Sequence, residues 1–476
     1  MAGYRRAKQR RSPWEGLWRD CYEFTLPQLE PFGQGAAAGR RGDRLFDATA
    51  ADAVDRLAAN LLAQLTPPWS RWFGLAPGRA VPERDRLEIG RVLDQAAERM
   101  LYHFDRSNFS VEIHQCYLDL AIAGTACLAF EEAPPGEASA FKFSAVPMSD
   151  AAVDEGPSGR LDTVYRENRM TKAQIATRFP RFVLPEALER QAKDDPDSRF
   201  TAIEAVIPEA TGFVYAAALM EAGDTGQFLA EGRYASSPFI AFRWLKAPGE
   251  SYGRSPVMKA LPDIKTANKI VELVLKNASI AVTGIWQAED DGVLNPANIR
   301  LVPGAIIPKA VGSAGLTPLE APGRFDVSDH MLEQLKARIR QALLADQMAP
   351  IESPRMTATE VLKRSAEMTQ LLGATFGRLQ AELLTPLVRR AMAILSRRGE
   401  IDPIVLDGHE VDLQHRSPLA RAQMRFDADT TVSWIELVRS FGPEAQQALD
   451  PAAAARWLGR SLGVPDPLIR AEARRG

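Results

Sequence analysis

The sequence contains little cysteine and no long apolar run. Its 476 residues include three cysteines, Cys21, Cys116 and Cys127, whose spacing fits neither a disulfide framework nor a metal-binding motif. This usage is typical of a reducing cytosol, and we expect no disulfide bond. No segment approaches the roughly 18 consecutive apolar residues of a membrane helix, and the N-terminus has no apolar signal-peptide core. We therefore expect no contact with a membrane.

Signals for common enzyme chemistry are also missing. No Gly-Lys dipeptide occurs, so the sequence lacks the Walker A loop that cradles a triphosphate, which argues against an ATPase. The segment Gly253–Val257 lacks the second glycine of a nucleophile elbow. The acidic and histidine residues between Asp407 and His415 lie far apart along a predicted strand, and we interpret them as polar surface rather than a metal site. We expect no catalytic, cofactor-binding or metal site.

Neither sign of charge is in excess. Lysine and arginine together number 58, aspartate and glutamate 61, and the formal net charge is -3. A protein that grips DNA statically is usually basic, because phosphate neutralisation supplies much of its affinity. The chain is 46% hydrophobic, which is enough for a sizeable core in a multi-domain protein. This balance argues against a static DNA binder.

The hydrophobic patterns predict a mixed α+β chain. Two segments, residues 47–65 and 112–121, have the period of amphipathic helices. Five shorter runs are predicted strands: residues 125–130, 140–146, 162–166, 213–218 and 238–244. No regular strand–helix alternation and no internal repeat is present. The N-terminal basic cluster of Arg5, Arg6, Lys8, Arg10 and Arg11 is interpreted as a solvated or disordered start, or as one that meets capsid or DNA phosphate, rather than as a targeting sequence.

Two helix-patterned segments flank a glycine- and proline-rich insert. The first begins with Ser255 as N-cap and Pro256 at the first helical position, and it runs to about Ala281. The insert spans residues 282–325 and contains short β-like runs at residues 283–286 and 305–307. The second helix is expected from about Val327, capped by Ser328 or Asp329, to Ala345.

A loop and a long helix follow. Residues 346–356 contain two prolines and cannot continue a helix. Thr357 and Glu360 then form a capping box, and the helical pattern persists to about Arg398, with a predicted kink at Pro386. Such a helix is on the order of 60 Å long, which is too long for the core of a compact domain.

The order of these elements resembles the head-to-tail connector, or portal, proteins of short-tailed bacteriophages. The motifs that carry the resemblance are Leu45–Ala50, Leu61–Pro68, Trp72–Phe73, Ala123–Ala126, Tyr252–Pro256, Leu261–Lys265 and Met356–Val361. They cover roughly residues 15–415 in the order of the family, whereas the segment from about Arg416 matches loosely. Several dispersed motifs in the right order are more specific than any one of them.

The resemblance implies an α+β portal fold that assembles into a ring. Its parts would be a wing (residues 1–250), a first stem helix (251–281), a β-containing clip (282–325), a second stem helix (326–345), a tunnel loop (346–356), a long wing helix with a return strand (357–415) and a short helical crown (416–476).

The resemblance also implies a function. Twelve subunits would surround a channel at one capsid vertex, through which terminase drives double-stranded DNA inward and the genome later leaves. The implied partners are further copies of the chain, DNA, terminase, a tail adaptor, and the major capsid and scaffolding proteins. The implied location is the portal vertex of the virion, with the host cytoplasm during assembly. A near-neutral chain fits a channel through which DNA slides, because its phosphates are then not held tightly at any one position.

The candidate contact residues follow from this architecture. DNA contacts are predicted at Lys265, Lys269 and Lys276 on the first stem helix and at Gln347, Met348, Ser353 and Arg355 in the tunnel loop. Contacts between the clip and partner proteins are predicted at Trp286, Asp290, Asp291 and Arg300. The lysine face has a second interpretation as an ordinary solvated surface. Which stem face lines the channel does not follow from the sequence.

The alternative function is a self-associating scaffold or adaptor without a DNA conduit, in which the long helix is a coiled-coil arm. A sustained heptad would favour it. From Val361 onward the apolar spacing does not keep a strict 3.5-residue period, Gly373 and Gly377 interrupt it, and Pro386 lies inside it. These features favour the portal. A DNA-processing enzyme is the third possibility, but no acidic cluster supports it.

Overall fold

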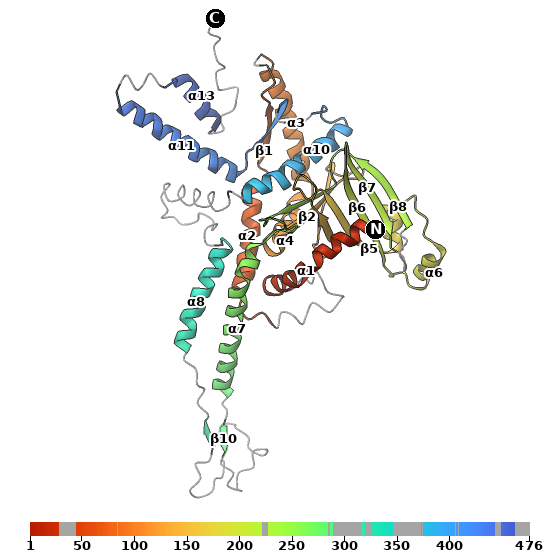
Figure 1. Ribbon diagram of the computed structural model, residues 1–476, viewed down its shortest axis with the longest axis vertical. Coiled ribbons are helices and arrows are strands. Elements are labelled where there is room, and N and C mark those ends of the chain that lie inside the picture. The colour runs from red at the N-terminus through yellow and green to blue at the C-terminus, as the bar shows by residue number, and fades with distance from the viewer. Residues whose placement is uncertain are drawn as a thin grey trace.

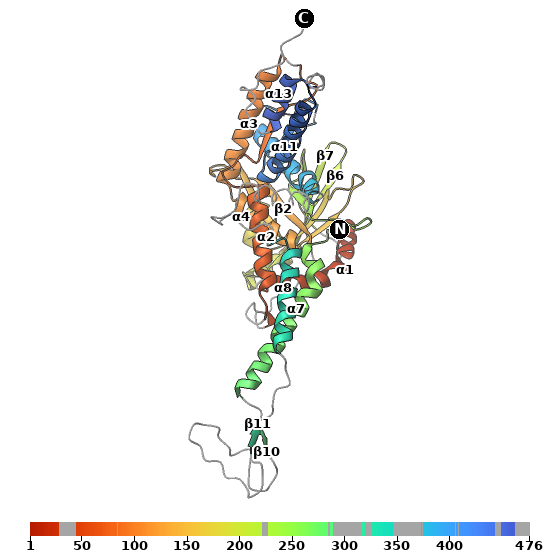
Figure 2. The same ribbon diagram turned by 90° about the vertical axis from the view of Figure 1, so that its left-hand side faces the viewer.

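The molecule is elongated, with two helices projecting from a body of helices and strands (Figure 1). The computed structural model describes residues 1–27, 44–82, 84–220, 227–283, 286–288, 316–318, 325–345, 373, 375–404, 406–407, 409–442 and 449–461. The projecting helices carry a small β pair at their far end, whereas the C-terminal helices lie at the opposite end of the body (Figures 1 and 2). The chain therefore presents a projecting end and a helical end.

Four helices form much of the body. They are α1 (Ala2–Thr25), α2 (Thr49–Leu65), α3 (Arg86–Arg106) and α4 (Phe109–Ala123). The predicted helices at residues 47–65 and 112–121 are confirmed as α2 and α4. Helix α4 is the most deeply placed, because both Ile113 and Tyr117 and most of its last two turns are buried. The sequence pattern did not reveal α3.

The two larger sheets of the body are antiparallel. One has three strands in the order β3 (Phe141–Val146), β2 (Thr125–Glu132) and β9 (Phe239–Arg243). The other has five, β4 (Ala151–Asp154), β5 (Thr163–Met170), β6 (Phe200–Glu209), β7 (Gly212–Leu219) and β8 (Gln227–Tyr234), in chain order. Helices α5 (Lys172–Arg178) and α6 (Glu186–Asp194) cover one face of this larger sheet. All five predicted strands are present, whereas β4, β6 and β8 were not predicted.

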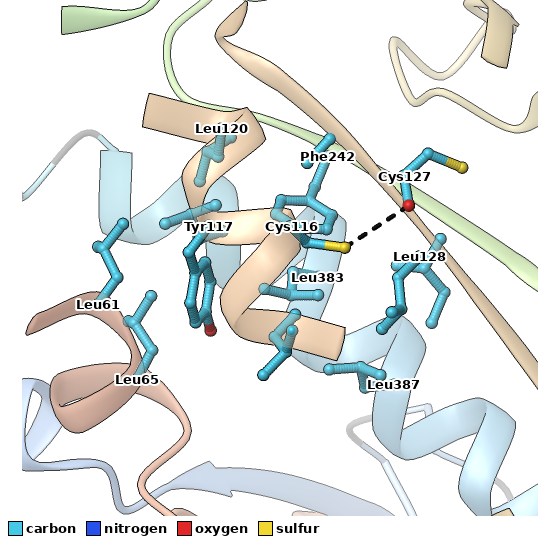
Figure 3. Close-up of a cluster of buried hydrophobic side chains, with 14 of the residues drawn as sticks. Leu61, Leu65, Cys116, Tyr117, Leu120, Cys127, Leu128, Phe242, Leu383 and Leu387 are labelled. Atoms are coloured by element: carbon cyan, nitrogen blue, oxygen red, sulfur yellow. Dashed lines mark hydrogen bonds between the residues drawn. The ribbon is translucent and has the colours of Figure 1, made fainter. Parts of the chain in front are cut away.

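The main core joins segments that are far apart in the sequence. Figure 3 shows side chains of α2, α4, β2, β9 and the C-terminal half meeting there: Leu61, Leu65, Cys116, Tyr117, Leu120, Cys127, Leu128, Phe242, Leu383 and Leu387. Fully burying one such apolar side chain contributes about 1.5–3 kcal/mol. All three cysteines are buried with free thiols. The Cys116 Sγ donates to the Cys127 carbonyl oxygen at 3.6 Å, while the sulfur of Cys127 points away (Figure 3).

The interpretation of the N-terminal basic cluster as a disordered start is wrong, because these residues belong to helix α1; four of the five are exposed, and Lys8, Arg10 and Arg11 contact the body. The buried Arg11 donates to the carbonyl oxygens of Met148, Ser149 and Ala151 at 3.2, 2.7 and 2.8 Å. Lys8 pairs with Glu167 at 3.1 Å, and Arg10 pairs with Asp154. The cluster therefore docks α1 on the edge of the five-stranded sheet.

Two of the motifs that carry the resemblance, Ala123–Ala126 and Tyr252–Pro256, meet at a pair of glycines. Gly124 ends α4 with φ at 75°, and a Cβ built on it would lie 2.5 Å from the Gly253 carbonyl oxygen. A Cβ on Gly253 would in turn lie 2.1 Å from the Gly124 carbonyl oxygen. No side chain fits at either position, since real Cβ atoms do not approach so closely. This close approach holds the start of the projecting helix against the end of α4.

The projecting pair consists of α7 (Pro256–Thr283) and α8 (Phe325–Ala342). The predicted cap is confirmed, since the Met258 N–H donates to Ser255 Oγ at 2.9 Å. Two details were wrong. Thr283 is the last residue of α7 rather than the start of a strand, and Ser328 and Asp329 lie inside α8, which begins at Phe325. The terminal β pair is β10 (Trp286–Ala288) with β11 (Leu316–Pro318); the predicted β-like run at residues 305–307 lies outside the described residues.

The long helix is described only in its C-terminal part. A π-helical turn at Gln380–Leu384 leads directly into α10 (Thr385–Arg397). At the predicted kink, the helix therefore has a widened turn just before Pro386, which accommodates the N–H that proline lacks. Strand β12 (Val411–His415) then pairs with β1 (Phe73–Pro77). The tunnel loop at residues 346–356 and the first part of the predicted helix, including Thr357 and Glu360, lie outside the described residues.

The C-terminal helices are α11 (Pro418–Ser440) and α13 (Pro451–Ser461). Apolar patterns at residues 432–440 and 452–462 predict helices in this segment, and the structure confirms them, although α11 starts earlier than its pattern. Within the described part of the chain, no helix is long and apolar enough to span a bilayer.

Candidate nucleic-acid interface

The three predicted lysines lie on one side of α7. Lys265, Lys269 and Lys276 follow at intervals of four and seven residues, and their side chains are 43%, 60% and 63% exposed. Asp263 points to nearly the opposite side of the helix, two residues before Lys265, and it pairs with Arg338 of α8 at 2.8 Å. The lysine face therefore turns away from α8.

The lysine face is already occupied by carboxylates of the same chain. Lys265 Nζ lies 2.6 Å from Asp20 Oδ2 of α1, so α1 partly covers this end of the face. Glu272 lies between the other two lysines, 2.9 Å from Lys269 and 2.6 Å from Lys276. The hydrogen bonds from Lys276 and Lys269 lower the pKa of Glu272, which keeps it ionised. The trio of Lys269, Glu272 and Lys276 carries a formal charge of only +1.

Such pairing changes what the face can do. A phosphate that approaches Lys269 or Lys276 has to compete with a carboxylate already in place, so no deep electrostatic well forms at one position. This arrangement suits transient contacts with a polyanion better than tight binding. It equally describes a solvated helix surface, so the charge pattern alone does not decide between the two predicted interpretations.

Apolar side chains remain exposed on the outer part of the helix pair. Near the body, the stripe of α7 buries Leu261 and Ile264. Three turns further on the same stripe reaches Leu275, which is 52% exposed, and on α8 Met331 is 56% exposed. Exposed apolar surface on two neighbouring helices is typical of a contact with another chain.

Asn268 is a residue of α7 that sequence reasoning missed. Its Oδ1 accepts from the backbone N–H groups of Phe46 and Asp47 at 2.7 and 3.1 Å, and its Nδ2 donates to the Arg44 carbonyl oxygen at 3.0 Å. The segment Leu45–Ala50, one of the motifs that carried the resemblance, is thereby fixed to α7. The signal for Asn268 in the sequence was a single amide at a position of the apolar stripe, four residues after Ile264.

The remaining predicted contact residues fall outside this geometry. Trp286 begins β10 at the far end of the projecting pair, which agrees with its predicted place in a terminal β element. Gln347, Met348, Ser353 and Arg355, together with Asp290, Asp291 and Arg300, lie outside the described residues. Their roles stay predictions.

One cluster outside the helix pair has the residue types of an enzyme site. His103 Nε2 lies 2.7 Å from Glu400 Oε2 beside a shallow pocket lined by Glu98, Arg99 and Tyr102. His103 Nδ1, however, accepts the Ala140 backbone N–H at 3.0 Å. Both ring nitrogens of His103 are therefore engaged, and the neutral imidazole has no free lone pair for a general base. The dyad joins α3 to the C-terminal half of the chain.

The predicted polar surface near β12 also has a structural explanation. Asp407 Oδ1 accepts the backbone N–H groups of His409 and Glu410, both at 2.7 Å, and so caps the turn before the strand. Among the residues that the structure describes, no group of histidine, cysteine, aspartate or glutamate side chains is arranged to hold a metal ion.

Comparison with known proteins decides the family. The model of a family described as bacteriophage head to tail connecting protein matches residues 1–469. The chain belongs to this family. The protein named "Probable portal protein" of Bordetella phage BPP-1 is 25% identical, over 96% of this chain and 86% of that protein. The portal protein of Salmonella phage epsilon15 is 23% identical over 97% of this chain and 86% of its own length, and that of Escherichia phage T7 22% identical over 91% and 84%.

The family match agrees with the resemblance found in the sequence. A head-to-tail connecting protein with a mixed α+β body and a projecting helix pair is what the dispersed motifs predicted. The match also covers α11 and α13, where the sequence resemblance was loose.

Proposed function

We propose that this chain is the subunit of a ring of about twelve copies, and that the ring forms the DNA channel at one vertex of a phage capsid. The observation that carries the proposal is the projecting pair of α7 and α8, whose apolar residues Leu275 and Met331 remain exposed in the single subunit. Packing against the same helices of neighbouring copies would cover this surface and line up the helix pairs around an axis.

The parts of the subunit then have separate roles. Helices α7 and α8 form the stem, the β10–β11 pair and its surrounding residues 282–325 form the clip that meets terminase and the tail adaptor, and α11 and α13 form the crown. Residues 346–356 form the tunnel loop. The role is structural and non-enzymatic: the ring guides DNA during packaging and ejection, and it joins capsid to tail in the virion after assembly in the host cytoplasm.

Electron microscopy of the purified protein tests the ring. Class averages along the particle axis should show rings of about twelve subunits with an open centre. Small dimers or rods at high protein concentration would contradict the proposal and favour the self-associating scaffold.

A charge reversal tests whether the lysine face lines the channel. The double variant Lys269→Glu with Lys276→Glu changes the charge of the trio with Glu272 from +1 to -3 without touching Lys265, which is bonded to α1. Rings should still form, while DNA packaging or retention falls. The control is Lys193→Glu on α6, an exposed lysine distant from the stem. Unchanged packaging by intact rings would show that another face lines the channel.

A further inference from the structure

Trp69 is held in a strained and exposed conformation. Its φ is 57°, a region that bulky non-glycine residues seldom occupy, and its side chain is 78% exposed. The Trp69 N–H donates to Asp105 Oδ1 of α3 at 2.9 Å, and two prolines precede it. A large apolar side chain fixed in water at the expense of backbone strain indicates a contact outside the subunit.

The surroundings of Trp69 resemble an interaction hot spot. Glu98, Tyr102 and Asp105 follow at helical spacing along one face of α3. Arg71 pairs with Glu98 and Trp69 bonds to Asp105, so the loop runs along this face. Tyr102 is 49% exposed, and the guanidinium of Arg106 lies over its ring at 4.4 Å. We call Trp69, Tyr102 and Arg106 the aromatic knob; Trp, Tyr and Arg are the residue types that dominate binding energy at interfaces.

A second unused surface lies on the five-stranded sheet. Cross-strand register places five apolar residues on the face opposite α5 and α6: Ile207, Val214, Ala216, Ala218 and Phe228. Helix α1 covers this face at Ile203, which packs with Tyr4 and Ala7. Beyond α1, Ile207 is 43% and Phe228 is 71% exposed. We call these five residues the open sheet face.

The two surfaces lie on opposite sides of the thin direction of the molecule. Figure 1 looks down the shortest axis, and Figure 2 shows α3 and α4 on one side of that axis, with α1, β6 and β7 on the other. The aromatic knob lies where α3 joins α4. A ring built head to tail needs two unlike patches on opposite sides of each subunit.

We propose that the aromatic knob of one subunit packs on the open sheet face of the next copy. This inference rests on the ring proposed above. Charge supports a second copy as the occupant: Glu98 is neutralised by Arg71, whereas the open sheet face carries Arg233, paired with Glu209 at 3.5 Å, and the exposed Glu231, which lies across from Ala216. A largely apolar face with this net negative charge matches a knob that carries the Arg106 guanidinium, and it does not suit a nucleic acid.

Cross-linking tests the contact directly. The double variant Trp69→Cys with Phe228→Cys, treated as rings with a short bis-maleimide, should give a ladder of covalent oligomers on a denaturing gel. The three native cysteines are buried and provide a low background. The matched control is Trp69→Cys with Val183→Cys, because Val183 is 84% exposed between α5 and α6, the helices on the other face of the sheet. Rings that give no ladder would overturn the proposal.

A substitution that relieves strain gives an independent test. Glycine adopts φ near 57° without cost, so Trp69→Gly should raise the melting temperature of the isolated subunit. The same variant should raise the subunit concentration needed for half-maximal ring formation by about tenfold or more. Ring formation at the wild-type concentration would overturn the contact while leaving the proposed function intact. A wild-type chain that forms no ring would instead refute the proposed function, and this contact with it.

Discussion

Arg243 and Glu382 form a buried, bidentate ion pair that joins β9 to the π-helical turn before α10. Arg243 Nη2 lies 2.7 Å from Glu382 Oε1, while Arg243 Nε and its backbone N–H reach Glu382 Oε2 at 3.2 and 3.0 Å. Arg243 also donates to the carbonyl oxygens of Ser251 and Gly159 at 3.0 and 2.8 Å. The carboxylate of the widened turn thus holds the strand that leads into the stem.

Removal of this carboxylate should be strongly destabilising. Glu382→Ala removes the nearer of two carboxylates from the fully buried Arg243 guanidinium and leaves Glu155, at 3.5 Å, as the other, so we expect a loss of about 3 kcal/mol in the free energy of unfolding. Urea unfolding followed by circular dichroism measures the loss. The control is Glu250→Ala, which removes an exposed pair with Arg254 and should cost less than about 1 kcal/mol. Equal effects of the two variants would contradict this account.

The glycine pair should tolerate no side chain. Gly253→Ala forces a Cβ against the Gly124 carbonyl oxygen, where backbone rather than a mobile side chain must move, so we expect a loss of about 3 kcal/mol or more. The matched control is Gly16→Ala in α1, where nothing lies within 4 Å of the added Cβ, and where alanine should stabilise the helix by roughly 0.5–1 kcal/mol. Thermal unfolding compares the two variants. A soluble Gly253→Ala chain of normal stability would show that the close approach is not required.

Asp119 should make stability depend on pH. Its burial beneath α1 raises its pKa from 3.8 to about 7, although the Tyr22 hydroxyl donates to Asp119 Oδ1 at 2.6 Å. Between these values the folded chain holds a proton that the unfolded chain has released, so this group makes stability fall as pH rises from about 4 to 7. Asp119→Asn keeps an acceptor for Tyr22 and should remove that part of the slope. Superimposable pH profiles of wild type and variant, measured by urea unfolding, would contradict the prediction.

Asn268 should be needed to hold the segment 44–47 on α7. Asn268→Ala removes three hydrogen bonds and leaves the N–H groups of Phe46 and Asp47 without their acceptor, which should cost about 1–3 kcal/mol. Hydrogen exchange of these two amides should accelerate in the variant. Lys269→Ala, the exposed neighbour on the same helix, should leave the exchange unchanged. Equal protection in both variants would show that the clamp is dispensable.

The regular parts of the fold were predictable because their signals are local. The apolar period of α2, the cap of α7 at Ser255 and the strand patterns of β2 and β9 depend on a few adjacent residues. Dispersed motifs then supplied the family, although the structure shows that several of them are structural. Gly124 and Gly253 touch each other, and the segment Leu45–Ala50 includes two backbone donors to Asn268.

The errors arose where a distant partner decides the outcome. The arginines and lysines of α1 have a solvated pattern, yet Arg11 is buried because its acceptors, the carbonyl groups of residues 148, 149 and 151, lie far along the chain. The role of the lysine face stays a prediction: Asp20 and Glu272 reduce its charge, and of these two only Asp20 is distant in the sequence. Trp69 is marked by a strained dihedral angle and by its exposure, and neither can be read from a sequence.

The length of α7 gives the β10–β11 tip mechanical leverage on the body. The helix has 28 residues and is roughly 40 Å long, and its polar contacts with the body at the N-cap Ser255, at Lys265 and at Asn268 lie at its start and in its first half. A sideways load on the tip therefore reaches the body as a torque about that short anchored stretch. Docking of a partner at the tip would therefore first load the contacts of α7 and its start with Gly124, Asp20 and Phe46, which belong to other parts of the body.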